Sequence, residues 1–269
     1  VPQSGFRIPP GDRSVAVLEL PLGNIARDTA AMYRVTLHGK RTVNGYNGYE
    51  PLYYQVLKHA LADRDRTALE ALASFGPLLI AADNGVATTR SWASFLSNHP
   101  GIRHLGDDKK WTLFQLPTSR SRRDGCESNP VAITAIFDEQ GQVDAMTLTD
   151  QNPATRWITA HPQRVGDALT LDLGRAERLC GIVVSMGWEA ELYPRKLRVR
   201  TSVDNVTWKT RFEGRMGGSA FRAALENPRD ARFTIPLRGQ AARFVTLRVE
   251  QSHPLYQWAV ADIVVEAQR

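Results

Sequence analysis

From residue 131 to the end of the chain, apolar and polar residues alternate in short runs separated by turn-forming residues. Leu169, Leu171 and Leu173 fall on one face of an extended segment, so this run can bury one side of a strand and expose the other. Asp204 and Asn205 tolerate positive φ and are expected to form the turn of a hairpin. Many short strands with no strong helix between them predict an all-β sandwich or jelly roll. Similar runs occupy residues 196–201, 243–249 and 261–266.

In the first part of the chain, residues 12–117, the apolar residues follow two different spacings, that of a strand and that of a helix. A short apolar run that ends at Pro21 indicates a strand, whereas residues 51–62 carry apolar side chains at helical spacing. Helices followed by a buried apolar run predict a small α/β domain. We expect a second helix at residues 66–73, a buried strand at 78–82, a helix near 91–97, and a hairpin of residues 101–105 and 111–116 around a turn at 106–108.

The length of 269 residues is more than one core usually serves, so we expect two domains. The change of pattern divides the chain into an α/β domain at residues 1–118, a basic linker at 119–130 and an all-β domain at 131–269. The net charge of +6 is spread along the chain and interleaved with acids, which argues against a nucleic-acid partner. The linker holds the one tight basic cluster, which we interpret as a solvated hinge rather than a phosphate-binding patch: Arg120, Arg122 and Arg123.

The chain has no apolar run long enough to span a bilayer, and its first residues lack an initiator Met and a signal-peptide pattern. We expect it to be a piece of a longer protein whose membrane segment lies upstream. Two cysteines, Cys126 and Cys180, exclude a cysteine-rich zinc site. They form one bridge between the linker and the second domain, or they remain two free thiols.

Five motifs in the second segment follow the order known from discoidin-type domains. The loop Asp-Gln-Asn-Pro-Ala-Thr-Arg-Trp at residues 150–157 is similar to a loop of that family. The other four motifs begin at Leu171, Tyr193, Ser202 and Ala242, and a final stretch at residues 258–266 also fits. The segment therefore resembles the discoidin (coagulation factor 5/8 type C) family. This resemblance implies a galactose-binding-like jelly-roll sandwich that serves as a ligand-binding module.

The same loop suggests a structural calcium ion, because calcium prefers six to eight oxygen ligands and the loop offers several. Asp150, Asn152 and Thr155 supply them, and the resemblance adds Asp262 from the last strand. Gln151 stands where the family usually has glycine, which questions the left-handed turn of this loop. The alternative is a metal-free loop in which Asp150 caps neighbouring amides.

Aromatic residues divide into two groups. Trp157, Trp208 and Trp258 lie at positions that the family uses for packing, so we expect them in the core. Loops that surround one mouth of the sandwich hold the candidates for stacking on a sugar ring and for contacting its hydroxyl groups. These are Trp188, Tyr193 and Tyr256, with His161, Glu189 and Arg215 as polar partners; the alternative is that each is an ordinary loop residue.

We find no convincing catalytic set: the chain lacks a nucleophile elbow, a phosphate-binding loop and a dinucleotide fingerprint. The first domain resembles the soluble C-terminal region of polytopic bacterial membrane glycosyltransferases. The residues that carry this resemblance are the Leu-Glu-Leu-Pro-Leu run at 18–22, the Asn-Gly-Tyr-Asn-Gly-Tyr loop at 44–49, and the helix-to-strand step that ends at 82.

These observations favour the extracytoplasmic C-terminal part of a bacterial membrane protein, a glycosyltransferase by resemblance, whose discoidin-type module binds glycan or a cell-surface polymer. No activity is expected for this part alone. Two other functions stay open: an architectural module without a small ligand, and a binding module appended to a hydrolase. A first domain without a convergent acid, base or nucleophile would argue against the hydrolase.

Overall fold

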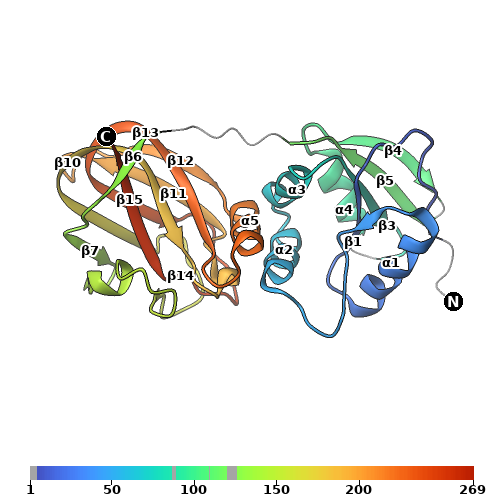
Figure 1. Ribbon diagram of the computed structural model, residues 1–269, viewed down its shortest axis with the longest axis horizontal. Helices are drawn as coiled ribbons and strands as arrows, with labels where there is room; N and C mark the ends of the chain where they lie inside the picture. The colour runs from blue at the N-terminus through green and yellow to red at the C-terminus, as the bar shows by residue number, and fades with distance from the viewer. Residues whose placement is uncertain (1–4, 87–88, 109, 120–125) are drawn as a thin grey trace. The chain divides into compact units, whose positions relative to one another are not determined.

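A computed structural model describes residues 5–86, 89–108, 110–119 and 126–269 (Figure 1). The chain forms two compact units. The first comprises Val1–Pro51 and Leu61–Ser121, and the second comprises Leu52–Ala60 and Arg122–Arg269. No helix among the described residues is long and apolar enough to cross a membrane. The basic cluster expected in the linker lies outside the described residues.

The first unit contains a five-stranded sheet in the order β2-β1-β3-β5-β4. The strands β1, β2 and β3 run parallel, and β5 pairs antiparallel with both β3 and β4. Every residue of β3 is buried, as the apolar run predicts for a central strand. The strands are β1 (Ala16–Leu20), β2 (Arg41–Thr42), β3 (Leu78–Asp83), β4 (Arg103–Asp108) and β5 (Trp111–Leu116).

The described residues before 119 also form four helices, and three of them are those that the sequence predicts; Leu52–Ala60 of one of these helices belong to the second unit. The additional helix begins after Asn24, whose side chain accepts a hydrogen bond from the Arg27 amide, and ends at Gly39 with φ of 69°. The expected turn at residues 106–108 is wrong, because these residues belong to a strand. The helices are α1 (Ile25–His38), α2 (Leu52–Ala62), α3 (Arg66–Ala73) and α4 (Thr89–Ser97).

The second unit is an antiparallel sandwich, as predicted, and two long strands build both of its layers. β10 (Ala168–Ser185) and β13 (Arg232–Val249) pair with each other along their length, with register shifts between Asp172 and Glu177 and between Leu179 and Gly181. Before the shifts, β10 also pairs with β7, and the second half of β13 pairs with β11. Beyond them, β10 pairs with β15. The two long strands therefore pass from one layer to the other.

Most of the remaining strands extend these layers, and β9 and β14 form a separate two-stranded sheet. The turn between β11 and β12 contains Asn205 at φ of 61°, which confirms the predicted hairpin. The strands are β6 (Ser128–Val131), β7 (Ala135–Asp138), β8 (Gly141–Val143), β9 (Trp157–Ile158), β11 (Lys196–Ser202), β12 (Lys209–Arg215), β14 (Ala259–Val260) and β15 (Asp262–Gln268). Because β6 begins at Ser128, the sandwich starts earlier than the expected residue 131.

The second unit also contains a helix, α5 (Gly217–Glu226), and two short 3-10 helices, η1 (Ala145–Leu148) and η2 (Ala190–Leu192). The expectation of no strong helix between the strands is therefore wrong at α5. Trp258 is fully buried, which confirms its core position. Trp157 and Trp208 are only partly buried, so the core assignment does not hold for their whole rings.

Cys126 and Cys180 form a disulfide, which decides between the two states that the sequence leaves open. The bridge spans 54 residues and ties the segment before β6 to the middle of β10. It therefore constrains the first strand of the sandwich against a central one.

Candidate functional site

A cavity of about 220 Å³ lies in the second unit, where the β7–β8 turn meets β9 and the loop that leads into β10. It combines an aromatic ring with polar groups from three different segments. Its lining residues are Asp138, Glu139, Gln140, Trp157, Ile158, Thr159, Ala160, His161, Asp167 and Ala168.

The ring of Trp157 is held in place from two sides. Its Nε1 donates a hydrogen bond of 2.8 Å to Asp138 Oδ2 at the end of β7. The ring also packs edge-on against the buried Trp258, with centroids 5.1 Å apart. Because both contacts fix its orientation, Trp157 offers the cavity a rigid aromatic surface.

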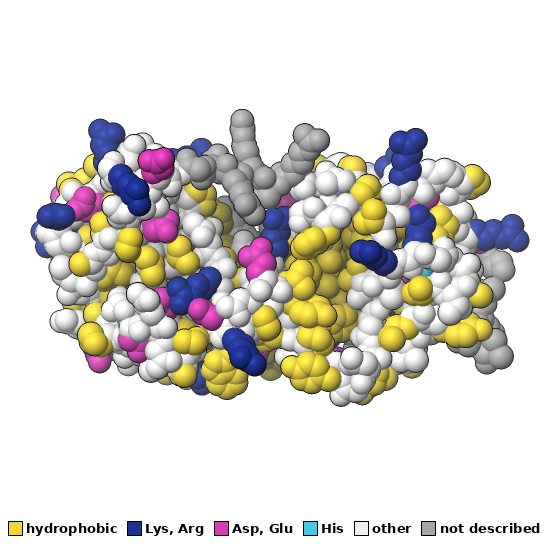
Figure 2. Space-filling view, viewed as in Figure 1, with side chains coloured by type: hydrophobic (Ala, Val, Ile, Leu, Met, Phe, Trp, Pro, Cys, Tyr) yellow, Lys and Arg dark blue, Asp and Glu magenta, His cyan; other side chains and the backbone are white. Residues whose placement is uncertain are grey.

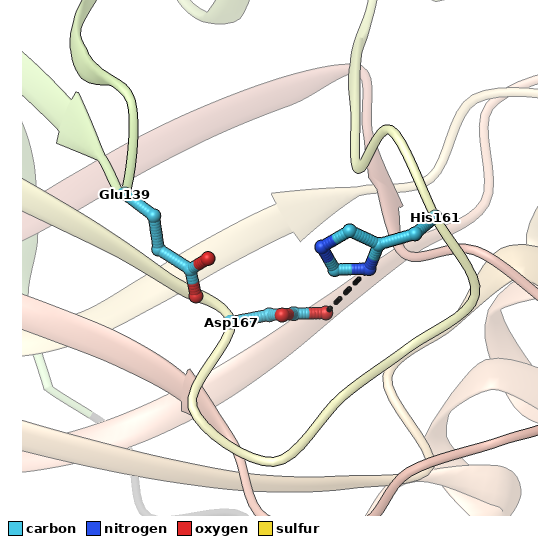
Figure 3. A group of neighbouring side chains, drawn as sticks. All are labelled: Glu139, His161 and Asp167. Atoms are coloured by element: carbon cyan, nitrogen blue, oxygen red, sulfur yellow. Dashed lines mark ion pairs between the residues drawn. The ribbon is translucent and has the colours of Figure 1, made fainter.

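Three titratable side chains converge at the same cavity (Figure 3). Glu139, His161 and Asp167 each place a potential ligand atom within 4.8 Å of the others. Asp167 is buried and accepts a hydrogen bond of 2.8 Å from the amide of Arg164, which fixes its carboxylate. Among the residues that the structure describes, this is the one group of three such side chains close enough to hold a metal ion.

The histidine ring has a defined orientation. His161 Nδ1 lies 2.9 Å from the carbonyl oxygen of Pro162 and 3.9 Å from Asp167 Oδ2. A carbonyl only accepts hydrogen bonds, so Nδ1 carries the proton and Nε2 keeps its lone pair in the neutral ring. Figure 3 shows this second nitrogen on the side of Glu139. The cluster therefore offers acceptors, Nε2 and the carboxylate oxygens of Glu139 and Asp167, to the hydroxyl groups of a ligand.

Of the six ligand-binding residues expected from the sequence, His161 alone lines this cavity. Trp188 is 55% exposed and forms a separate cluster with the Arg156 guanidinium, which lies 5.8 Å from its ring centroid. Glu189 belongs to the same cluster, because it forms an ion pair of 2.7 Å with Arg156. Arg215 is the last residue of β12 and pairs with Lys196 across the hairpin.

Tyr193 and Tyr256 form a third group. Tyr193 is fully buried, so the expectation that its ring faces a ligand is wrong. The guanidinium of the buried Arg195 packs against both rings, with its carbon 4.0 Å from the Tyr193 ring centroid and 4.9 Å from the Tyr256 ring centroid. Tyr256 is partly exposed and also contacts His253, with ring centroids 4.9 Å apart. The rings of Tyr193 and Tyr256 therefore pack against other side chains of the protein.

The loop expected to bind calcium adopts the left-handed turn despite its departure from the family pattern. Gln151 has φ of 57°. Asp150 accepts hydrogen bonds from the Asn152 amide at 2.9 Å and from the Thr155 hydroxyl at 2.7 Å. These bonds lower the pKa of the Asp150 carboxyl. They are the bonds that the metal-free alternative requires.

Asp262 is the fourth expected ligand, and its environment differs. It is 2% exposed, and neither of its carboxylate oxygens accepts a hydrogen bond of good geometry among the described residues. Burial raises the pKa of this carboxyl, and the Arg232 guanidinium, 3.4 Å away, and the backbone amide of Gln151 oppose the rise without cancelling it. Asp262 and Gln151 line one cavity of about 350 Å³. A buried, unsatisfied carboxylate beside an oxygen-rich loop fits a calcium ion.

Sequence reasoning missed Asp138, Glu139 and Asp167. A polar turn such as Asp-Glu-Gln-Gly at residues 138–141 normally indicates a solvated hairpin tip, and nothing in it signals a neighbour more than 20 residues away. The short separation of His161 and Asp167 is visible in the sequence, but the direction of their side chains within a loop is not.

A model of the F5/8 type C domain family matches residues 131–262. Among solved structures, the chain is similar to the CBM32 of AlyQ in complex with 4,5-unsaturated mannuronic acid, with 14% identity, a TM-score of 0.39, and coverage of 51% of this chain and 97% of that one. It is also similar to the family 32 CBM from C. perfringens NanJ in complex with galactose, with 17% identity, a TM-score of 0.38, and coverage of 52% and 98%. The comparison with curated proteins found no relative.

Proposed function

Because residues 131–262 form an F5/8 type C domain, we propose that this module binds carbohydrate in the cavity that Trp157 and His161 line. The observation that carries the proposal is the meeting of a fixed aromatic ring with three hydrogen-bonding side chains in one cavity. Sugars require this combination, since one face of a pyranose is apolar and its hydroxyl groups need donors and acceptors. A volume of about 220 Å³ favours one small ring over a long buried oligosaccharide.

Each side chain has a distinct role in this proposal. The Trp157 ring receives the apolar face of the sugar, and its bond to Asp138 keeps it oriented. His161 and Glu139 bind hydroxyl groups at the exposed side of the cavity. The buried carboxylate of Asp167 accepts a hydrogen bond from a sugar hydroxyl group. This bond is charge-assisted and therefore stronger than one between neutral groups.

The test is a glycan array followed by calorimetry with the best monosaccharide, on the intact chain and three variants. We expect His161→Ala and Glu139→Gln each to weaken binding by about tenfold, because the first removes a hydrogen bond to the sugar and the second removes the charge that strengthens one. Trp188→Ala is the matched control, since Trp188 is exposed and lies outside the cavity. Loss of binding in Trp188→Ala alone would move the site to the Arg156 cluster. Binding to no sugar at all would refute the proposal.

We also propose that the loop at residues 150–155 binds a structural calcium ion together with Asp262. Bound calcium would neutralise the buried carboxylate and order the loop. Thermal unfolding should shift upward with calcium and return with a chelator, and Asp262→Asn should abolish the shift. Asp144→Asn is the control, because Asp144 caps η1 outside the loop. An unfolding temperature that does not change with calcium would show that Arg232 alone compensates the charge of Asp262.

A second function, the architectural module, is favoured by one observation. The buried Arg195 guanidinium packs against the rings of both Tyr193 and Tyr256, so two of the expected ligand-binding rings are engaged by the protein itself. The glycan array separates the two functions, because an architectural module binds no sugar.

We further propose an extracytoplasmic location and, on the resemblance of residues 12–117, a membrane glycosyltransferase as the parent. The Cys126–Cys180 bridge supports the location, since structural disulfides persist in oxidising compartments. The sequence of the complete protein tests the parent: membrane-spanning helices upstream of Val1 support it, and a glycoside hydrolase domain there contradicts it.

A further inference from the structure

The first unit has a cavity of its own, of about 370 Å³, at the carboxyl ends of its parallel strands. β1 lies between β2 and β3, so the chain leaves β1 towards one edge of the sheet and leaves β3 towards the other. Connections that diverge in this way open a crevice outside the carboxyl ends of the strands, where open α/β sheets bind their ligands. Glu19 and Leu20 of β1 and Asp83 of β3 all line the cavity.

Two cationic side chains meet at this cavity beside one carboxylate, that of Asp83. Arg27 Nη1 and Lys110 Nζ lie 3.6 Å and 3.5 Å from the same oxygen, Asp83 Oδ2. The side chains of Arg27 and Lys110 are 39% and 52% exposed, so both can reach an incoming group. Arg27 Nη1 is buried and has no hydrogen-bond partner among the described residues.

A third donor lies in the wall of the same cavity. Trp111 is 4% exposed, and its Nε1 is buried without a hydrogen-bond acceptor in the described part of the chain. The first turn of α1 also lines the cavity, through Asn24 and Arg27. The positive end of a helix dipole favours a negative group there.

The deeper groups are already satisfied and form a fixed wall. Glu19 accepts two hydrogen bonds from Arg34. Asn44 Oδ1 accepts from the Glu19 amide at 2.8 Å, and Asn44 Nδ2 donates to Asp28 at 2.9 Å. These contacts do not require a ligand. The lining atoms that still need a hydrogen-bond partner are the donors Arg27 Nη1 and Trp111 Nε1. Among the charged lining residues, three are cations and two are carboxylates.

We propose that this cavity binds the phosphate group of a small phosphorylated molecule. Arg27, Lys110 and Trp111 donate to the phosphate oxygens, since arginine and lysine form charge-assisted hydrogen bonds with phosphate. Asp83 occupies both cations in the absence of a ligand and therefore competes with the phosphate. The site is separate from the carbohydrate cavity of the second unit.

The experiment is calorimetry of the intact chain with inorganic phosphate and glucose 1-phosphate, and with vesicles that contain phosphatidate. We expect Arg27→Gln and Lys110→Gln each to weaken phosphate binding by about tenfold. The matched control is Arg41→Gln, which removes an exposed charge on β2 outside the cavity. Binding of the vesicles but not of the soluble phosphates would identify a lipid headgroup as the source of the phosphate.

Asp83→Asn gives the most discriminating result. It removes the competing charge and keeps an oxygen that can accept the hydrogen bond from the Gly85 amide. If the ligand is an anion, phosphate affinity should rise by about fivefold. A fall in affinity, or binding of a divalent cation that Asp83→Asn abolishes, would overturn the proposal. Equal phosphate binding by the wild type, Arg27→Gln and Lys110→Gln would overturn it as well.

Discussion

At the scale of single residues, the ion pair between Asp172 and Arg243 joins the two long strands just before their register shift. Arg243 donates to both carboxylate oxygens of Asp172, at 2.8 Å and 2.9 Å, and the Gly174 amide adds a bond of 2.7 Å. These contacts, Arg243 first, hold the pKa of the Asp172 carboxyl below its ordinary value of 3.8. The pair therefore stabilises the fold most when the carboxyl is ionised.

This shift predicts a pH dependence of stability. A carboxyl whose pKa is lower in the folded state contributes stability above its unfolded pKa and loses it as the pH falls through the folded pKa. We expect urea unfolding from about pH 6 to about pH 3 to show a smaller loss of stability in Asp172→Asn than in the wild type. Because the pair is partly exposed, high salt should reduce the difference. Identical pH profiles would show that the pair contributes nothing.

Single residues also show what the sequence could not reveal. Asn205 occupies the left-handed turn that the sequence predicts, because turn chemistry is local, whereas Gln151 adopts a left-handed turn that its side chain had put in question. Tyr193 is buried although it lies in a connecting segment. The sequence could not predict this burial, because loop residues lack the periodic pattern that shows which side chains face the core. The sequence therefore located His161 of the candidate site but neither the β7–β8 turn nor the roles of Trp157 and Asp167.

At the scale of elements, two helices escaped prediction, each for its own physical reason. The buried residues of α1 include Asp28 and Arg34, which pair with other polar groups and so interrupt the apolar stripe. α5 begins with Gly217 and Gly218, which lower its helix propensity. The strands were found more readily, because period-two burial uses apolar side chains that need no partner of complementary charge.

The cap of α1 is testable. Asn24→Ala removes the side chain that accepts from the Arg27 amide and should lower the free energy of unfolding of the first unit by about 1 kcal/mol. Urea denaturation followed by circular dichroism measures the change. Asn24→Asp retains the cap and serves as the control, so equal losses in both variants would count against a capping role.

The disulfide makes a larger contribution at the same scale. A bridge across 54 residues restricts the unfolded chain, and removing a native one typically costs about 2–5 kcal/mol. We expect the double variant Cys126→Ala, Cys180→Ala to lose an amount in this range in urea unfolding. A reducing agent should destabilise the wild type similarly and leave the double variant unchanged. An effect of reduction on the double variant would show that the loss has another origin.

At the scale of the whole molecule, charge is distributed without one dominant patch. Figure 2 shows basic side chains scattered over the visible face, with acidic side chains among them mainly on the left-hand part, in accord with the interleaving seen in the sequence. A mixed surface of this kind gives little long-range attraction for a polyanion. Recognition of an anion then depends on local convergence, as at Arg27 and Lys110, and not on the net charge of +6.

The two units have separate sheets and separate candidate sites, which predicts two separable unfolding transitions. Reduction of the disulfide should lower one transition, that of the sandwich, because both cysteines belong to the second unit. Phosphate should raise the other, because all residues of its proposed site belong to the first unit and a ligand stabilises the state that binds it. Scanning calorimetry measures both shifts in one sample. A single transition that responds to both agents would mean that the two units unfold together although their sheets are separate.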